Sequence, residues 1–170
     1  MKKQLINECR LSFPSLSVNE SYARAVTAAF AAQCDPTVKE ISEIKTAVSE
    51  AVTNAIVHGY RGCVGTVELI LRQMSGGVIY ISVRDKGAGI ADIEQAMTPL
   101  FTTAPEEERS GLGFSVMSSF MDTVSVKSAP GKGTTVTMQK RLSCRTAPGF
   151  REHIPESSVS PVELPEKQVT

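Results

Sequence analysis

Apolar and polar residues alternate over residues 4–13, and this two-residue period predicts a first β-strand. Over residues 16–34 the apolar positions recur at helical spacing instead, which predicts an amphipathic helix. Ser17 or Asn19 is suited to cap this helix, because either side chain can accept a hydrogen bond from a free backbone N–H. The chain is therefore expected to open with a strand followed by a helix.

A second amphipathic helix is predicted to follow directly. Asp35 is expected to be its N-cap and Pro36 its first residue, where the missing N–H of proline costs nothing. Gly59 is expected to end the helix. The predicted buried stripe consists of Ile41, Ile44, Val48, Ala51, Val52 and Ala55.

Four further strands are predicted in two hairpins. Residues 66–74 and 78–85 are rich in β-branched residues and are joined through Ser75-Gly76-Gly77, a sequence suited to a tight turn. Residues 123–129 and 134–142 form the second pair, connected by a short segment that contains proline and two glycines. Each hairpin predicts antiparallel pairing.

The remaining segments are a polar stretch, a helix and a tail. Residues 92–110 contain two prolines and few apolar positions, which predicts a short helix followed by a long mobile segment. Another helix is expected from the glycine-rich stretch that begins at Gly111. Prolines, serines and glutamates dominate the C-terminal end, so we expect one domain over residues 1–144 and a disordered tail over residues 145–170.

This order of elements predicts the fold class. The strands gather in hairpins rather than alternating with helices, which favours an α+β fold over a parallel doubly wound one. We expect a two-layer sandwich: a mostly antiparallel sheet with the helices on one face.

Composition excludes several classes of partner. The 18 basic residues equal the 18 acidic ones, so no overall field favours nucleic acid or an anionic membrane. No apolar stretch approaches the roughly 20 residues of a membrane span, and no signal-peptide core follows the first lysines. The four cysteines are scattered without a C-x-x-C pair, which favours reduced thiols in a cytoplasmic protein.

Glu50 and Asn54 lie one turn apart in the second predicted helix, on a flank away from its buried stripe. At about 100° per residue the two side chains lie within about 40° of each other. Such a pair taken alone is more often a solvent-exposed face than a site, so its meaning depends on other motifs. His58 lies on the same flank and is expected to have a capping or structural role.

Asp85-x-Gly87-x-Gly89 follows a predicted strand directly. An aspartate at this position can accept a hydrogen bond from an exocyclic amine such as that of adenine, and glycines allow the backbone to approach a ligand closely. A calcium loop is the alternative, but no further acidic ligands follow at the required spacing.

Two further glycine-containing stretches can contribute to the same site. RSGLGF, which ends at Phe114, precedes a helix and can offer backbone N–H groups to phosphate, although structural glycines at a helix start explain it equally well. It is neither a Walker A motif nor a dinucleotide fingerprint. GKGTT contains Thr134, whose hydroxyl can join a base-binding site; a plain hairpin turn is the stronger interpretation.

Taken in order along the chain, E-x-x-x-N, D-x-G-x-G, G-x-G-F and G-T-T resemble the boxes of the GHKL nucleotide-binding superfamily. That superfamily includes gyrase B, Hsp90, histidine kinases and MutL. More closely, NESYARAVTAAF, EIKTAVSEAVTNAIVHGY, VRDKGAGIADIEQA and PLFTTAPEEERSGLGFSVMSSFMD resemble the anti-sigma-F factors of endospore-forming bacteria, over about residues 5–142. The resemblance implies the GHKL (Bergerat) ATP-binding fold.

The resemblance also implies roles for individual residues. Asn54 would be the ligand of Mg²⁺, Glu50 the general base, and Asp85 the group that reads the adenine amine. Arg24 resembles the family's exposed partner-contact arginine, with a solvated helix arginine as the alternative. Thr102, Thr103 and Arg109 would belong to a lid over the phosphates. The other implied ATP or ADP contacts are Gly87, Ala88, Gly89, Ser110, Gly111, Leu112, Gly113 and Thr134.

The implied function is that of an anti-sigma factor with serine kinase activity. It would bind and inhibit a sporulation sigma factor of RNA polymerase, and would phosphorylate its anti-anti-sigma antagonist with ATP and Mg²⁺. A homodimer is implied, with no direct contact to nucleic acid or membrane. Alternatives are a stress-response anti-sigma kinase and a non-catalytic, nucleotide-gated sigma-binding module. A sensor histidine kinase or gyrase-like ATPase is disfavoured, because neither a dimerisation helix with a phospho-acceptor histidine nor a transducer domain is recognisable.

Overall fold

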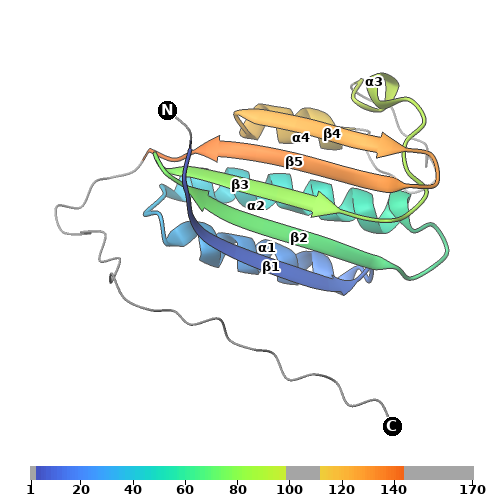
Figure 1. Cartoon of the computed structure of the whole chain (residues 1–170), viewed down its shortest axis with the longest axis horizontal. Coiled ribbons are helices and arrows are strands. Elements are labelled where there is room, and N and C mark those ends of the chain that lie inside the picture. The colour runs from blue at the N-terminus through green and yellow to red at the C-terminus, as the bar shows by residue number, and fades with distance from the viewer. Residues whose placement is uncertain (1–2, 99–111, 144–170) are drawn as a thin grey trace, which may run out of the picture.

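The computed structural model describes residues 3–98 and 112–143, which form an antiparallel sheet with helices along one face (Figure 1). The strands are β1 (Leu5–Pro14), β2 (Thr66–Met74), β3 (Val78–Arg84), β4 (Thr123–Ala129) and β5 (Gly133–Arg141). The helices are α1 (Val18–Ala32), α2 (Val38–Asn54), the π-helical turn η1 (Ala55–Gly59), α3 (Ile93–Ala96) and α4 (Gly113–Phe120). The predicted α+β fold, with helices on one face of an antiparallel sheet, is confirmed.

The strand order β1-β2-β3-β5-β4 places β5 between β3 and β4. Both predicted hairpins are present, and Gly76 and Gly77 adopt the positive φ angles, 76° and 69°, that a tight turn requires. Arg84 at the end of β3 is paired with Thr135 near the start of β5. This pairing brings two motifs about 50 residues apart in the sequence to the same edge of the molecule.

The core lies between the sheet and the helices. Alternate residues of the central strands face the helices, and α2 contributes the apolar stripe that its sequence predicts. Ala47 belongs to this stripe as well, whereas Ile41 is only half-buried. The largest fully buried side chains include Ile44, Val48, Val52, Leu69, Leu71, Ile79, Ile81, Met117 and Met138.

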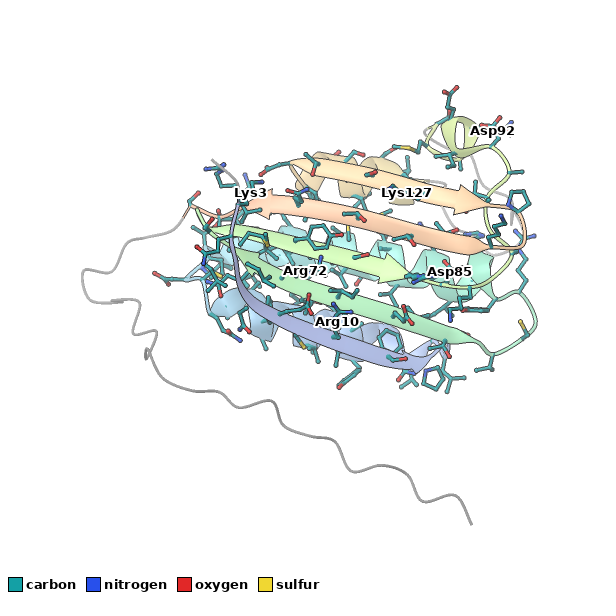
Figure 2. All side chains as sticks on the ribbon, viewed as in Figure 1. Lys3, Arg10, Arg72, Asp85, Asp92 and Lys127 are labelled. Carbon is teal, nitrogen blue, oxygen red and sulfur yellow. The ribbon has the colours of Figure 1, made fainter. Side chains whose placement is uncertain are left out.

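The other face of the sheet carries charged side chains, among them Arg10 on β1 and Arg72 on β2 (Figure 2). Glu8 forms ion pairs with both arginines, and the guanidinium of Arg72 lies 5.3 Å from the ring centroid of Tyr80. These contacts lie outside the core and outside the site described below.

The start of α1 differs in detail from the prediction. Ser17 is the N-cap residue, but its backbone is already helical (φ −56°, ψ −31°) and its side chain makes no capping hydrogen bond. An N-cap side chain reaches the free N–H groups from an extended backbone, which Ser17 lacks. Asn19 does not cap either, because its Nδ2 donates to the carbonyl of Pro14 at 2.8 Å.

The predicted start of α2, with Asp35 as N-cap and Pro36 as first residue, is wrong. Asp35 has a φ of +49° and closes the turn after α1, with its N–H donating to the carbonyl of Ala32 at 3.2 Å. The helix begins after Thr37 instead, in a capping box with Glu40. Thr37 Oγ1 accepts from the N–H of Glu40, and Glu40 Oε2 accepts from the N–H of Thr37 at 2.7 Å. Two reciprocal bonds outweigh a single aspartate cap.

The end of α2 adds a feature that the pattern did not predict. Gly59 does end the helical segment, as expected, but its last turn is the π-helical turn η1, which begins after Asn54. Single π-helical turns occur frequently at functional sites, because they widen the helix and redirect the side chains of one turn.

The segment before α4 and the chain after β5 are only partly described. The short helix expected after residue 90 is α3, capped by Asp92 Oδ1, which accepts from the N–H of Gln95 at 2.8 Å. Most of the predicted mobile segment and the predicted tail lie outside the described residues. Among the described helices, none has the length and apolar content to cross a membrane.

Candidate active site

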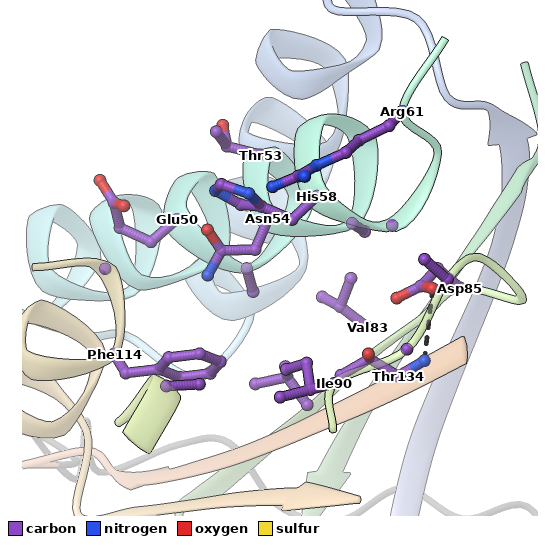
Figure 3. Close-up of a pocket in the computed structure, with 18 of the residues that line it drawn as sticks. Glu50, Thr53, Asn54, His58, Arg61, Val83, Asp85, Ile90, Phe114 and Thr134 are labelled. Atoms are coloured by element: carbon purple, nitrogen blue, oxygen red, sulfur yellow. Dashed lines mark hydrogen bonds between the residues drawn. The ribbon is translucent and has the colours of Figure 1, made fainter. Parts of the chain in front are cut away.

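A cavity of about 700 Å³ opens between the end of α2, the loop after β3, the start of α4 and β5 (Figure 3). Its volume suits a ligand the size of a nucleotide. Eight of the residues predicted from the sequence line it: Glu50, Asn54, Asp85, Ala88, Gly89, Leu112, Gly113 and Thr134. The structure therefore brings residues from all four motifs to one place.

Glu50 and Asn54 face this cavity from the helical wall (Figure 3). The stripe of α2 that includes Val48 and Val52 packs on the sheet, which leaves the flank with Glu50 and Asn54 for the cavity. The first residue of α4 lies against both: a Cβ at Gly113 would lie 3.0 Å from Glu50 Oε2 and 3.3 Å from Asn54 Nδ2. Glycine at this position allows the backbone of α4 to approach the two polar side chains.

Asp85 lies at the opposite wall and is only 4% exposed. Its Oδ1 accepts hydrogen bonds from the N–H of Gly87 at 2.9 Å and from the N–H of Thr134 at 3.3 Å. Desolvation raises the pKa of Asp85, and hydrogen bonds from the backbone of Gly87, Thr134 and Asp85 itself offset this rise only in part. Both bonds to neighbouring residues fall on Oδ1, so Oδ2 is the oxygen available to a ligand.

The glycines of the loop after β3 are required by close backbone contacts. A Cβ at Gly87 would lie 2.0 Å from the carbonyl oxygen of Gly59, and Gly87 itself does not line the cavity. Gly89 has a φ of +72°, and a Cβ there would lie 2.0 Å from the carbonyl oxygen of Ala129. Gly87 therefore serves loop packing, whereas Gly89 combines loop packing with a place in the cavity wall.

Thr134 contributes through its backbone as well as its side chain. Its carbonyl accepts from the N–H of Asp85 at 2.9 Å, while its N–H donates to the carboxylate of the same residue. The hydroxyl of Thr134 lies 2.9 Å from Ser128 Oγ, within hydrogen-bond distance. Ser128 Oγ also accepts from the N–H of Ile90, so the β4–β5 hairpin holds the loop after β3.

Several lining residues were not predicted from the sequence. Arg61 is one of them and extends near His58 on the helical wall (Figure 3), and α3 contributes Gln95 together with its N-cap residue Asp92. His58, which the sequence placed on the same flank as Glu50 and Asn54, lines the cavity too, and its expected capping or structural role stays a prediction. The apolar lining residues look like core in any sequence pattern. Those apolar residues include Val83, Ile90, Phe114 and Val136.

The other predicted residues lie elsewhere. Arg24 is on α1, away from the cavity; its Nη1 lies 3.3 Å from Glu20 Oε1 and donates to Ser49 Oγ at 3.3 Å. Thr102, Thr103, Arg109, Ser110 and Gly111 lie outside the described residues.

The donor set constrains the metal that the site can hold. Within residues 3–98 and 112–143 no group of three or more His, Cys, Asp or Glu side chains could bind a metal ion without help. Mg²⁺ is commonly held by one or two protein oxygens together with phosphate oxygens and water. The carboxamide of Asn54 beside Gly113 fits that pattern, with phosphates supplying further ligands.

Comparison with known proteins gives consistent matches. Residues 13–140 match the family described as the histidine kinase-like ATPase domain. The chain is 60% identical over 136 residues to the anti-sigma F factor of Thermoanaerobacter sp. (strain X514), which covers 80% of this chain and 94% of that protein. It is 54% identical over 138 residues to the anti-sigma F factor of Bacillus subtilis (strain 168), which covers 81% and 94%.

Solved structures support the same fold. The RsbU and RsbW domains of Rv1364c from Mycobacterium tuberculosis superpose with a TM-score of 0.59 at 20% identity, over 81% of this chain and 32% of that one. Full-length ShkA in complex with AMPPNP gives 0.52 at 16% identity, over 84% and 31%. Such low identities indicate the shared fold alone. The family is shown by the relatives that are more than 50% identical to this chain and by its histidine kinase-like ATPase domain. The chain belongs to the anti-sigma F factor family.

Proposed function

We propose that this chain binds and inhibits a sporulation sigma factor of RNA polymerase and, with ATP, phosphorylates a serine of the anti-anti-sigma factor that opposes it. One observation carries the catalytic half of the proposal. Glu50, Asn54, Asp85 and Gly113, from three separate segments, line one cavity in a member of the anti-sigma F factor family.

In this proposal Asp85 reads the base. Its buried carboxylate is fixed through Oδ1, and Oδ2 accepts a hydrogen bond from the 6-amino group of adenine. A guanine or hypoxanthine base presents a carbonyl there, which would leave two acceptors facing each other in a buried place. Ala88 and Gly89 pass close to the base, and Thr134 completes that side of the cavity.

The phosphates are proposed to lie between Asn54 and the start of α4. Backbone N–H groups at Leu112 and Gly113, together with the positive end of the helix dipole, favour negative charge there. Asn54 would hold Mg²⁺, which supplies charge neutralisation across the phosphate oxygens. The remaining proposed contacts are Thr102, Thr103, Arg109, Ser110 and Gly111.

Glu50 is proposed as the general base. As the serine oxygen forms its bond to the γ-phosphorus, its proton passes to the Glu50 carboxylate, and the bond between the γ-phosphorus and the bridging oxygen breaks to leave ADP. The close approach of Gly113 to Glu50 Oε2 supports this assignment, because it sets the base beside the N–H groups that face the phosphates.

The protein partners are proposed from the family. Phosphorylation adds about −1.5 to −2 charges at neutral pH, which disrupts a docking surface and would release the antagonist. Arg24, whose side chain is 41% exposed on α1, is the proposed contact to a partner. We further propose a cytoplasmic homodimer whose bound nucleotide, ATP or ADP, selects the partner.

Phosphotransfer tests the proposal directly. The protein is incubated with γ-labelled ATP, Mg²⁺ and the candidate antagonist, and label on the antagonist is measured for wild type, Glu50→Gln and Glu68→Gln. Glu68, on the outer face of the sheet, is the matched control. We expect Glu50→Gln to lower the transfer rate at least about a hundredfold, within the range typical of a lost general base, and Glu68→Gln to leave it unchanged.

The same assay separates kinase from binding module. Retention of sigma binding by Glu50→Gln, measured by co-elution, would show two activities on one chain. Absence of label transfer by the wild-type protein would reject the kinase and leave a nucleotide-gated sigma-binding module.

A further inference from the structure

Tyr60 is the first residue after the π-helical turn and is 8% exposed. It does not line the cavity. Tyrosine hydroxyls that are buried normally have a hydrogen-bond partner, and the identity of the partner indicates what the residue holds in place. For Tyr60 the partners belong to two different segments.

The hydroxyl of Tyr60 connects β2 with the loop after β3. It donates to the carbonyl of Thr66 at 2.7 Å and accepts from the N–H of Lys86 at 2.8 Å. Lys86 stands between Asp85 and Gly87, so the hydroxyl fixes the backbone next to the residue proposed to read the base.

The neighbouring Gly59 holds the other side of the same loop. Its carbonyl accepts from the N–H of Ala88 at 2.8 Å, and a Cβ at Gly59 would lie 2.9 Å from Asp85 Oδ1. The dipeptide Gly59-Tyr60 therefore binds the N–H groups on both sides of Gly87, whose own N–H donates to the Asp85 carboxylate. These three bonds hold the backbone of the loop beside Asp85 and the position of its Oδ1.

We propose that Tyr60 is a positioning residue that determines base selectivity by holding Asp85 in the orientation that accepts the adenine amine. This inference depends on the proposed role of Asp85. Loss of the hydroxyl would leave the N–H of Lys86 without its acceptor and allow the loop to turn. The proposed hydrogen bond from the 6-amino group of adenine to Asp85 would then weaken. A purely structural tyrosine would affect stability without changing the preference among bases.

Gly65 provides a second way to disturb Tyr60 without touching the cavity. A Cβ at Gly65 would lie 2.0 Å from Cε1 of the Tyr60 ring, so alanine at this position forces the ring to move. Gly65 does not line the cavity either. Tyr60→Phe and Gly65→Ala should therefore have the same effect on selectivity through different atoms.

The experiment measures base selectivity by calorimetry with Mg²⁺ present, below the melting temperature of each variant. Dissociation constants are obtained for ATP and for purine riboside triphosphate, which lacks the 6-amino group. We expect the wild-type preference for ATP to fall about tenfold in Tyr60→Phe, corresponding to about 1.4 kcal/mol, and similarly in Gly65→Ala. Tyr80→Phe is the matched control, because Tyr80 lies under Arg72 on the outer face of the sheet.

Different outcomes reject different statements. If Tyr60→Phe and Gly65→Ala keep the wild-type ratio of the two constants, whatever their stability, Tyr60 has no part in selectivity. If the wild-type protein binds ATP but shows no preference over the analogue, the base-reading role of Asp85 is wrong. If the wild-type protein binds neither nucleotide, the proposed function itself fails.

Discussion

Two buried carboxylates differ in their hydrogen bonds: Glu40 in the first turn of α2, and Asp85, which lies beside Gly59 at the end of η1. Glu40, 8% exposed, accepts from the N–H and hydroxyl of Thr37 on Oε2 and from the N–H of Ser143 on Oε1. Asp85, 4% exposed, accepts from neighbouring backbone N–H groups on Oδ1. The first joins the start of α2 to the end of β5, and the second faces the cavity.

The difference appears in the pKa values. For Glu40 burial opposes ionisation, but hydrogen bonds from Ser143 and Thr37 together outweigh it and lower the pKa to about 2. For Asp85 burial dominates and the pKa is raised. A carboxylate with hydrogen bonds on both oxygens stabilises the fold, whereas burial opposes ionisation of one that keeps an oxygen for a ligand. Similar burial therefore serves two purposes.

Asp85→Asn is the strongest test of this comparison. Its Oδ1 can still accept from Gly87, but the amide nitrogen then presents a donor to the adenine amine. We expect ATP affinity to fall about a thousandfold, or about 4 kcal/mol, because a buried hydrogen-bond mismatch is strongly rejected. The melting temperature of the ligand-free protein should not decrease, because the substitution removes a buried acidic group. Calorimetry and thermal unfolding measure the two effects, and a loss of stability with ATP binding intact would reverse our assignment.

Glu40→Ala should give the opposite pattern. It removes the capping box of α2 and leaves the N–H of Ser143 without its acceptor, for a total loss of about 3 kcal/mol in the free energy of unfolding. ATP affinity of the folded protein should stay unchanged, because Glu40 does not line the cavity. Denaturant unfolding combined with calorimetry measures both quantities. A weaker affinity of the folded variant for ATP would mean that the two ends of the helix are coupled.

The pH dependence of stability sharpens the contrast. Glu40 has a folded pKa of about 2, below its ordinary 4.5, so its contribution is complete above pH 4.5 and is lost as the pH falls toward 2. Between pH 7 and pH 3 the loss amounts to about 2 kcal/mol. Asp85 acts in the opposite sense: its raised pKa means that protonation on acidification favours the folded state.

Urea unfolding at several pH values measures these slopes. Glu40→Gln should flatten the acid limb relative to wild type, and Asp85→Asn should steepen it. Identical slopes for all three proteins would contradict the assignment of both groups.

Glu68→Gln sets the baseline for a carboxylate that is neither buried nor in the cavity. Glu68 Oε2 lies 3.8 Å from Arg84 Nη1, and the two side chains are 39% and 54% exposed. Exposed pairs of this kind contribute little, so we expect a change in unfolding free energy of less than about 0.5 kcal/mol. A larger decrease in the unfolding free energy, measured by thermal unfolding, would show that burial does not explain the different contributions of Glu40, Asp85 and Glu68 to stability.

Local patterns were sufficient to predict most of the fold. The hairpin glycines, the apolar stripe of α2 and the alternation in β1 each depend on neighbours within a few residues, and these elements appear as predicted. The N-cap of α2 failed for a related reason: Asp35 and Thr37 are both good caps locally, and the reciprocal bond from Glu40 decided between them. The η1 turn had no local signal.

The site divides in the same way. Glu50, Asn54 and Asp85 line the cavity, and spacing and resemblance predicted them, because the chemistry of a site limits which residue types can serve it. Tyr60, Arg61 and the lining residues of α3 were missed, since a tyrosine after a helix or an arginine in a turn has many ordinary explanations.

The sequence by itself determined the elements, their hairpins and the residue types available for chemistry, because these depend on periodicity, turn residues and side-chain functional groups. Only the tertiary structure decided which oxygen of Asp85 faces the cavity, why Gly87 must lack a side chain and what the hydroxyl of Tyr60 holds. The physical reason is distance: these contacts join segments such as Gly59 and Ala88 that meet after the sheet and helices have packed, and their ångström-scale geometry depends on all the packed elements together.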